Sequence, residues 1–337
     1  MPDLIYQNPK YGLASDLSIG VSEPPNKAPI SAIVPTRNRA SVFSRTLVSI
    51  GAQSVQPAEM VVVDASDDDE TYTLCHTNIP GLSTKIIYYR AAKKGAAVQR
   101  NQAMQYATYP HILFCDDDIL LEPSCIAELW RALDQDSALG GVCTLITNCH
   151  YTAPGRFSRT IFRFLNGHAE ESYAGKCIGP VMNLLPEDSE DLPPVVPVEW
   201  MNSTCTLYRR EAMPDPPFPT HFVGYSLMED VTLSLQVGKD WKLANVRTAK
   251  IFHDSQPGDH KNDQAVLAKM DLVNRYYVMT QVLKRTQPGD YIKLLVQQLF
   301  SLAASLQAKQ GWIALPKVVL AKLNGIVEIL TTRQPAA

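Results

Sequence analysis

The segment HILFCDDDIL, residues 111–120, runs an apolar stretch directly into three consecutive aspartates. Ile112, Leu113 and Phe114 are typical of a buried strand, so Asp116–Asp118 follow where the chain leaves the core. Like charges this close repel one another, and most charge runs are only solvated surface. Carboxylates at the mouth of a buried strand are instead typical of a functional site.

Short apolar runs and helical stretches alternate around this segment. The alternation predicts an α/β fold with a mostly parallel, doubly wound, Rossmann-like sheet. In such sheets the ligand crevice lies beyond the carboxyl ends of the strands, where three polar loops fall, at 36–39, 64–69 and 116–118. The expected elements are strands at 30–36, 60–65, 85–90, 111–116 and 141–147 and helices near 41–52, 68–78, 95–108 and 123–135.

The rest of the chain is less regular. Residues 198–213 predict a strand that runs into a helix, and residues 226–243 predict a helix. Residues 261–333 predict a C-terminal helical extension of amphipathic helices, broken at Pro288-Gly289 and at Pro316. Its stripe of Ile292, Leu295, Leu299, Leu302 and Leu306 either packs on the protein's own core or lies on a membrane face or a partner.

Composition excludes some functions. The chain has 337 residues, 45% of them hydrophobic, and a formal net charge of -3. This charge gives no broad attraction to nucleic acid, and we expect no such partner. The first ten residues lack the layout of a signal peptide, and no apolar run approaches the ~18 residues of a membrane span. We therefore expect a cytoplasmic protein with reduced cysteines, at most peripheral at the inner membrane face.

Four motifs, in chain order, resemble those of the GT-A glycosyltransferases of family 2. The first strand with Pro35–Arg39 resembles the first nucleotide-binding loop, and VVVDASDDD at 61–69 resembles the second strand with its base-binding aspartate. GAAVQRNQAM at 95–104 is similar to the helix beside the donor, and Asp116–Asp118 matches the Asp-x-Asp metal motif. The resemblance covers about residues 30 to 285.

Two later motifs extend the resemblance. Glu229-Asp230 resembles the pair that supplies the catalytic base, and His253 resembles a histidine metal ligand. One departure is the segment MNSTC at 201–205, where many members have a small glycine-containing segment. That departure concerns the acceptor side.

The resemblance implies a GT-A fold and an inverting, metal-dependent glycosyltransferase that uses Mn²⁺ or Mg²⁺. The donor would be a UDP-, dTDP- or GDP-sugar, and the acceptor a saccharide or a lipid-linked saccharide, as in polysaccharide biosynthesis. The implied domain layout is an extended arm at 1–29, a GT-A domain at 30–260 with a donor half (30–148) and an acceptor half (149–260), and the helical region at 261–337.

Each site residue has an expected role. Asp118 and His253 would hold the metal ion, because carboxylates and diphosphate oxygens are ligands for a hard cation. Asp116 would lie near the ribose or complete the site, and Asp117 would hold the loop by hydrogen bonds. Other donor contacts are expected from Pro35, Thr36, Arg37, Arg39 and Arg100. The guanidinium groups of the three arginines suit phosphate.

Asp64 would bind the base, or else cap the next helix. Asp230 is the expected general base, and Glu229 would orient the acceptor or the base, although both could simply favour a helix N-terminus. Trp200 would stack on an acceptor sugar, or belong to the core.

Three other interpretations compete with that of a glycosyltransferase. A GT-A-like binding or scaffold protein would have lost turnover. A sugar-nucleotide pyrophosphorylase expects a glycine-rich first loop, but PTRNR at 35–39 contains no glycine. An aspartyl phosphatase is expected to have Thr or Val two residues after the second aspartate of its motif, but this chain has Leu120 there.

Overall fold

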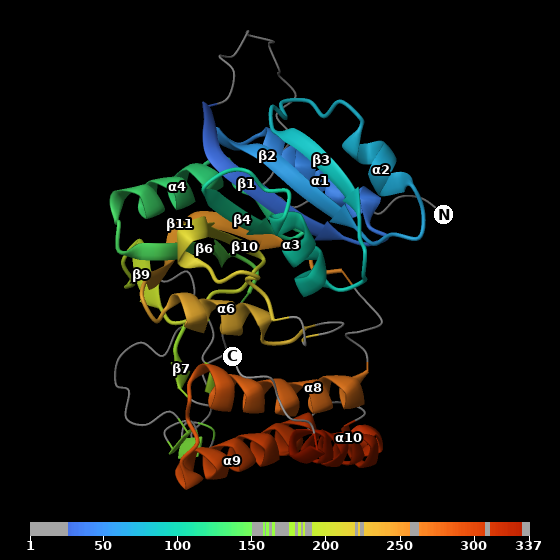
Figure 1. Cartoon of the computed structure of the whole chain (residues 1–337), viewed down its shortest axis with the longest axis vertical. Helices are drawn as coiled ribbons and strands as arrows, with labels where there is room; N and C mark the ends of the chain where they lie inside the picture. Colours follow the sequence, from blue (N-terminus) through green and yellow to red (C-terminus); the bar gives the residue numbers. More distant parts are fainter. Residues whose placement is uncertain are drawn as a thin grey trace.

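The computed structural model of the chain describes residues 26–149, 191–219, 226–256, 263–306 and 311–331, with Phe222 and short pieces between 158 and 185. Figure 1 shows a sheet with helices on both faces and, at the other end of the long axis, a layer of C-terminal helices. Helix α6 lies between these two parts.

The first half of the sheet is parallel. Its strand order is β3-β2-β1-β4, and Thr36 at the end of β1 pairs with Asp64 at the end of β2. The predicted polar loops therefore leave the same edge of the sheet. The elements are β1 (Asn26–Thr36), α1 (Ala40–Gly51), β2 (Val55–Asp64), α2 (Glu70–Cys75), β3 (Lys85–Arg90), α3 (Ala96–Met104) and β4 (His111–Cys115).

In the second half, one antiparallel strand is inserted. β10 (Cys205–Arg209) pairs with β4 on one side and with β6 (Leu139–Ile146) on the other. β11 (Lys242–His253) runs parallel to β6, and β5 (Ile119–Leu121) pairs antiparallel with β11. The register His253–Ile119 brings the end of β11 next to the aspartate run. β9 (Val195–Val198) also pairs with β11.

Two apolar cores sandwich the sheet. Alternating β1 residues face opposite sides, so Ala32 and Val34 join the core under α1, α2 and α4 (Cys125–Gln135), whereas Ile33 joins the core under α3 and α6 (Glu229–Val237). Burial on both faces accounts for the nearly continuous apolar composition of the central strands.

The C-terminal layer contains three helices. They are α8 (Gln264–Tyr277), which continues into a π-helical turn (Val278–Val282), α9 (Pro288–Ser305) and α10 (Gly311–Thr331). The expected break at Pro288-Gly289 is confirmed, because Pro288 begins α9, where its missing N–H costs nothing. Among the described residues, no helix is long and apolar enough to cross a bilayer.

Two local predictions are wrong. Pro316 does not break the helix, because α10 runs through it; only about one turn precedes this proline, and the packing of α10 on α8 favours a continuous helix. The helix expected after the strand at 205–209 is only a 3₁₀ turn, Arg210–Ala212. Pro214 follows and disfavours a helical conformation at Met213.

Other elements match more closely. The helix predicted within 226–243 is confirmed as α6, and Gly238 follows its last residue. The first strand begins at Asn26, so residues 26–29 belong to the sheet and not to an arm, whereas residues 1–25 lie outside the described residues. Much of the predicted connection at 149–197 also lies outside them. The domain division at residue 260 stays a prediction.

Candidate active site

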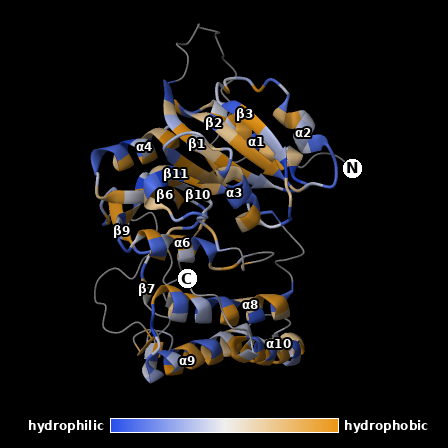
Figure 2. Ribbon diagram, in the orientation of Figure 1, coloured by the Kyte–Doolittle hydropathy of each residue, from blue (hydrophilic) through white to orange (hydrophobic). Residues whose placement is uncertain are grey.

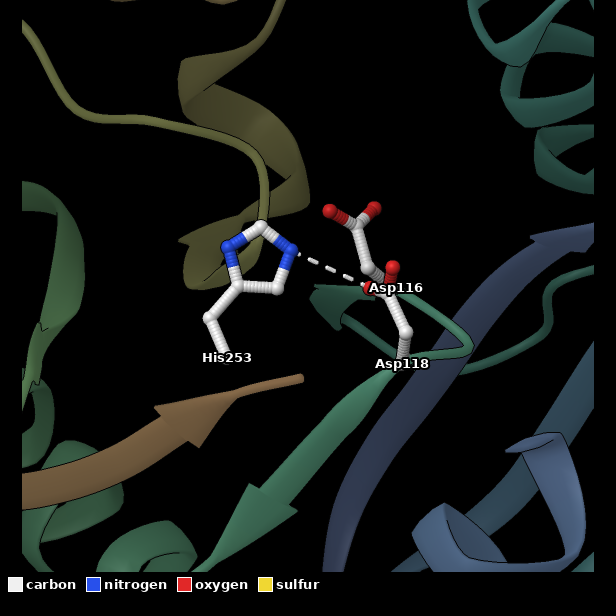
Figure 3. A group of neighbouring side chains, drawn as sticks. All are labelled: Asp116, Asp118 and His253. Carbon is white, nitrogen blue, oxygen red and sulfur yellow. Dashed lines mark hydrogen bonds and ion pairs between the residues drawn. The ribbon is translucent and has the colours of Figure 1, made fainter. Parts of the chain in front are cut away.

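The aspartate run links β4 to β5 at the edge of the sheet. The backbone N–H of Asp116 donates to the carbonyl of Thr204 at 2.9 Å, so β10 fixes the start of the run. Figure 3 shows the side chains of Asp116, Asp118 and His253 converging. One ligand atom of each lies within 4.8 Å of those of the other two.

His253 is the last residue of β11 and is held in place by Asn148. The backbone N–H of His253 donates to Oδ1 of Asn148 at 3.0 Å, and the Asn148 amide donates back to the carbonyl of His253 at 2.9 Å. Nε2 of His253 lies 3.2 Å from Oδ1 of Asp118. Asn148 therefore sets the position of the imidazole.

The chemistry of this group fits a divalent ion. Burial alone would raise the pKa of Asp118, but the hydrogen bond with His253 and the charges of His253 and Arg39 bring that pKa below its ordinary value. Asp118 is thus ionised at neutral pH. Carboxylate oxygens with one imidazole suit Mn²⁺, and carboxylates suit Mg²⁺.

Asp117 is not one of these three residues and holds the loop instead. Its Oδ2 accepts from the hydroxyl of Thr36 at 2.6 Å, and its Oδ1 accepts from Arg39 at 3.2 Å. Its carbonyl accepts from the hydroxyl of Thr46 at 2.8 Å. Burial raises the pKa of Asp117 to about 6. The loop that follows β1 is therefore tied to the aspartate run.

Arg39 bridges two aspartates. The same nitrogen, Nη1, lies 3.2 Å from Asp117 Oδ1 and 3.2 Å from Asp118 Oδ2. Arg37 is half exposed and lies 3.8 Å from Asp67. Pro35 lies within β1, paired with Val63. Of the two arginines, Arg39 is thus the one beside the candidate metal ligands.

Asp64 is fully buried at the end of β2. Its Oδ1 accepts from the backbone of Ser66 at 2.8 Å, and its Oδ2 accepts from the hydroxyl of Tyr88 at 2.8 Å and from Arg90 at 3.2 Å. It does not cap the following helix, which begins at Glu70 after Asp69. A structural contribution through Tyr88 and Arg90 replaces the expected capping alternative.

Arg100 joins the aspartate run to the Glu-Asp pair. This arginine is only 3% exposed, its Nη2 donates to Asp116 at 2.7 Å, and its Nη1 donates to Glu229. Its guanidinium lies over the ring of Phe218, 5.6 Å from the centroid. Two carboxylates thus offset its charge, so the guanidinium connects the two halves of the site.

Glu229 and Asp230 open helix α6. Burial raises the pKa of Glu229 to about 7 and that of Asp230 to about 6. Asp230 as a residue is half-buried, and its Oδ1 accepts from the N–H of Val231 at 2.8 Å. A carboxylate with the pKa of Asp230 is mostly ionised at neutral pH yet basic enough to accept a proton.

The turn before α6 has an unusual backbone. Ser226 has φ of 51° and Met228 has φ of 76°, both in the left-handed region. Such conformations persist where the surrounding structure fixes them, and they concentrate at functional sites. Here Asn274 of α8 donates to the carbonyl of Leu227 at 2.6 Å, and Thr232 donates to that of Met228 at 2.9 Å.

Comparison with known proteins agrees with this architecture. Residues 31–182, which include β1 to β6 and the aspartate run, match the model of the family described as "Glycosyl transferase family 2". The sequence of residues 31–182 thus resembles glycosyl transferase family 2. The predicted resemblance to this family is confirmed over these residues.

Curated relatives of this chain include two proteins named "PGL/p-HBAD biosynthesis glycosyltransferase". One is from Mycobacterium bovis (strain BCG / Pasteur 1173P2) and one from Mycobacterium tuberculosis (strain ATCC 25177 / H37Ra). Each is 29% identical over 138 residues, which is 40% of this chain and 54% of the relative. The chain spans about half the length of the curated relatives it matches.

Two solved structures share the GT-A fold. The mannosyltransferase PcManGT from Pyrobaculum calidifontis, in complex with GDP-Man and Mn²⁺, is 17% identical with a TM-score of 0.51, over 93% of this chain and 78% of that one. S. aureus TarS 1-349, in complex with UDP-GlcNAc, is 16% identical with a TM-score of 0.52, over 88% of this chain and 80% of that one. The predicted GT-A fold with C-terminal helices is confirmed.

Most of the predicted residues converge on the aspartate run. Arg39 and His253 pair with Asp117 and Asp118, whereas Arg100 pairs with Asp116 and Glu229, so two sets of ion pairs meet at consecutive aspartates. Trp200 lies apart from these contacts, partly buried beside an apolar cluster that includes Met228 and Val231. Its acceptor role stays a prediction.

Sequence reasoning missed three supporting residues. Asn148 positions His253, Thr46 holds the carbonyl of Asp117, and Gln99 donates to the carbonyls of Thr36 and Val63 at 3.0 and 2.8 Å. Gln99 carried a signal, because it directly precedes Arg100 in the motif helix. Asn148 and Thr46 carried none, since each depends on a partner more than 70 residues away.

Proposed function

We propose that the chain is an inverting, metal-dependent glycosyltransferase that moves a sugar from a nucleotide diphosphate to a hydroxyl acceptor. One observation carries the proposal. A candidate ligand set, Asp116, Asp118 and His253, is joined through buried Arg100 to an acidic pair suited to general-base catalysis.

The metal ion would be held by Asp118 and His253, with Asp116 completing the set. Mn²⁺ or Mg²⁺ bound there would offset the charge that develops on the leaving diphosphate. Arg39, whose Nη1 is shared between Asp117 and Asp118, would supply further donors for phosphate.

Asp230 would take the proton from the acceptor hydroxyl as that oxygen attacks the anomeric carbon. Its pKa of about 6 keeps it ionised at neutral pH while leaving it basic. A single displacement with one base inverts the anomeric centre. Glu229, held by Arg100, would orient the acceptor or the base.

The donor would lie across the carboxyl edge of β1, β2 and β4. Pro35, Thr36, Arg37 and Arg39 supply the first loop, and Asp64 lies at the end of the second strand for the base. Asp117 and Arg100 would act indirectly, by holding the loop and Asp116 in place. PcManGT in complex with GDP-Man and TarS in complex with UDP-GlcNAc support a GDP- or UDP-sugar donor, and a dTDP-sugar donor stays a prediction.

For the acceptor, we favour a saccharide or a lipid-linked saccharide, with Trp200 as a stacking surface. The curated relatives are named for PGL/p-HBAD biosynthesis. Polysaccharide biosynthesis, a cytoplasmic location and peripheral membrane contact stay predictions for this chain.

A screen of nucleotide sugars tests the proposal. The chain is incubated with each UDP-, GDP- and dTDP-sugar in Mn²⁺ or in chelator, and nucleoside diphosphate release is measured. We expect release with one class of donor, in metal only, and loss of release in Asp118→Asn. Binding of a nucleotide sugar without release or transfer under any condition would favour the scaffold alternative.

A further inference from the structure

The C-terminal helices have polar groups on their inner side. Lys322 of α10 is only 6% exposed and donates to Gln298 of α9. Gln298, also 6% exposed, donates to Asp271 of α8 at 2.9 Å, and Asp271 pairs with Arg275 at 2.6 Å. Polar side chains thus join α8, α9 and α10 in a layer that also buries Leu272, Leu294 and Val318.

The outer side of the same helices is apolar. Figure 2 shows hydrophobic residues along α9 and α10, at the end of the molecule away from the sheet. Positions 313, 320 and 327 recur every seven residues and so lie on one side of α10. We call this surface the apolar face; its main side chains, each more than half exposed, are Leu295, Leu299, Ile313, Leu320, Val327 and Leu330.

Exposed apolar groups elsewhere in the described chain are scattered, as is usual for protein surfaces. Val48 on α1 and Val266 on α8, for example, lie on separate helices. Exposed apolar side chains gathered on two helices that contact one another instead mark an interaction site. With a buried polar contact on the inner side and these apolar side chains on the outer side, this face is suited to an apolar environment.

The charge of the C-terminal helices indicates what binds to the apolar face. Residues 284–331 contain six lysines and arginines but only two acidic residues, in a chain whose net charge is -3. One of the six, Lys322, is buried and does not contribute to the surface charge. Both acids are paired, Glu328 with Lys269 at 2.6 Å and Asp290 with Arg285 at 3.5 Å. A second copy docked through this face would bring two basic surfaces together, whereas an anionic surface would complement one.

We propose that the apolar face docks on the surface of an anionic lipid bilayer, with α9 and α10 lying in the interface plane. Trp312, 70% exposed, and Tyr291, 40% exposed, are the aromatic types that favour the boundary between lipid and water. Lys317 is exposed on α10 and would meet lipid phosphates.

The docking helices are fixed to the candidate active site. Asn274 of α8 donates to the carbonyl of Leu227, two residues before Glu229, and Tyr277 and Val278 pack with Met228 and Val231. A bilayer under α9 and α10 would therefore lie at a fixed position relative to the general base. The conclusion that a lipid-linked acceptor reaches the site from this bilayer rests on the proposed function.

Vesicle flotation of the full chain tests docking without any donor or acceptor. We expect the chain to float with vesicles of equal parts phosphatidylcholine and phosphatidylglycerol, and much less with phosphatidylcholine alone. The variant Ile313→Asp/Leu320→Asp should stay at the bottom of the gradient. Lys317→Glu should weaken binding by about thirtyfold, since each unit of charge near an anionic surface contributes about fivefold.

The matched control is Val48→Asp, because Val48 on α1 is 56% exposed and Leu320 is 59% exposed. This control should float like the parent, and circular dichroism should show that all variants are folded. The proposal is overturned if the parent chain floats with neither kind of vesicle. It is also overturned if Ile313→Asp/Leu320→Asp floats as well as the parent chain. A parent dimer that this variant converts to monomer, without flotation, would instead assign the face to self-association.

These outcomes are separate from the transferase proposal. A chain that floats but releases no nucleoside diphosphate would support the docking proposal and contradict the transferase proposal. A chain that releases nucleoside diphosphate but never floats would support the transferase proposal and contradict the docking proposal.

Discussion

Replacing Arg100 with methionine should destabilise the protein strongly, because it removes the cation between two carboxylates. Arg100 is 3% exposed and contacts both Asp116 and Glu229. Methionine retains the apolar stem beside Phe218 and removes only the charged group. The remaining acids would be buried without their partner, which typically costs about 3–5 kcal/mol of unfolding free energy.

The pH dependence gives the prediction its specific sign. Burial already raises the pKa of Glu229 from 4.5 to about 7, and loss of Arg100 would raise it further. A folded-state pKa above the unfolded one means that the folded state binds more protons between these values, so stability falls as pH rises. The cost of Arg100→Met should therefore be smaller at pH 5 than at pH 8, by about 1.4 kcal/mol or more.

Urea unfolding, followed by circular dichroism at both pH values, measures this cost. The matched control is Arg131→Met, because Arg131 pairs with Glu128 on the exposed side of α4 and should cost only about 0.5 kcal/mol. If Arg100→Met cost no more than Arg131→Met, or its cost were the same at both pH values, the buried bridge would be refuted.

Three further predictions concern the base and the core. Asp230→Asn should keep donor affinity but lower transfer by roughly 100-fold or more, measured by calorimetry and by product formation; parent-rate transfer would move the base elsewhere. The rate of the parent enzyme should rise with pH around a midpoint near 6, the pKa of Asp230, because the base must be ionised; a rate that is flat from pH 5 to 8 would contradict this. Gly141→Ala should lower the unfolding free energy by about 1–3 kcal/mol, since its Cβ would lie 2.6 Å from the ring of Tyr208, whereas Gly289→Ala, with open space around it, should not; equal stabilities in thermal unfolding would contradict the packing argument.

The sequence predicted the strand ends well because parallel strands impose a simple rule. Once Thr36, Asp64 and Asp116 follow apolar runs, a parallel sheet brings their loops to one edge whatever the loops contain. The helix that carries Glu229 was also predictable, since the acids lead an apolar pattern and Gly238 ends it. These are local signals with one geometric consequence.

The contacts across the site were not predictable. Arg100 and Glu229 are 129 residues apart, and their meeting depends on β10, which inserts antiparallel between β4 and β6. Arg100 was accordingly expected to contact the diphosphate, whereas the structure places it between two acids. The buried position of Lys322 on α10 was hidden for the same reason, because only packing reveals that this lysine faces inward.

A sequence motif cannot predict the hydrogen-bond partners of every residue in the site. The Asp-x-Asp pattern marks Asp116 and Asp118 but does not say that Thr36 and Arg39 hold Asp117 between them. Hydrogen bonds of this kind depend on the register of β1 against β4, which is a property of the assembled sheet.

Calorimetric titration of UDP and of GDP into the protein, with Mn²⁺ and with chelator, tests the central claim most directly. We expect one of them to bind in Mn²⁺ and neither to bind detectably in chelator, because Asp116, Asp118 and His253 leave the diphosphate charge uncompensated without an ion. Asp118→Asn should weaken the Mn²⁺-dependent binding by roughly tenfold or more, since even changes outside the ligand shell cost this much, whereas Asp134→Asn on exposed α4 should not. Equally tight binding in Mn²⁺ and in chelator, unchanged in Asp118→Asn, would contradict the account.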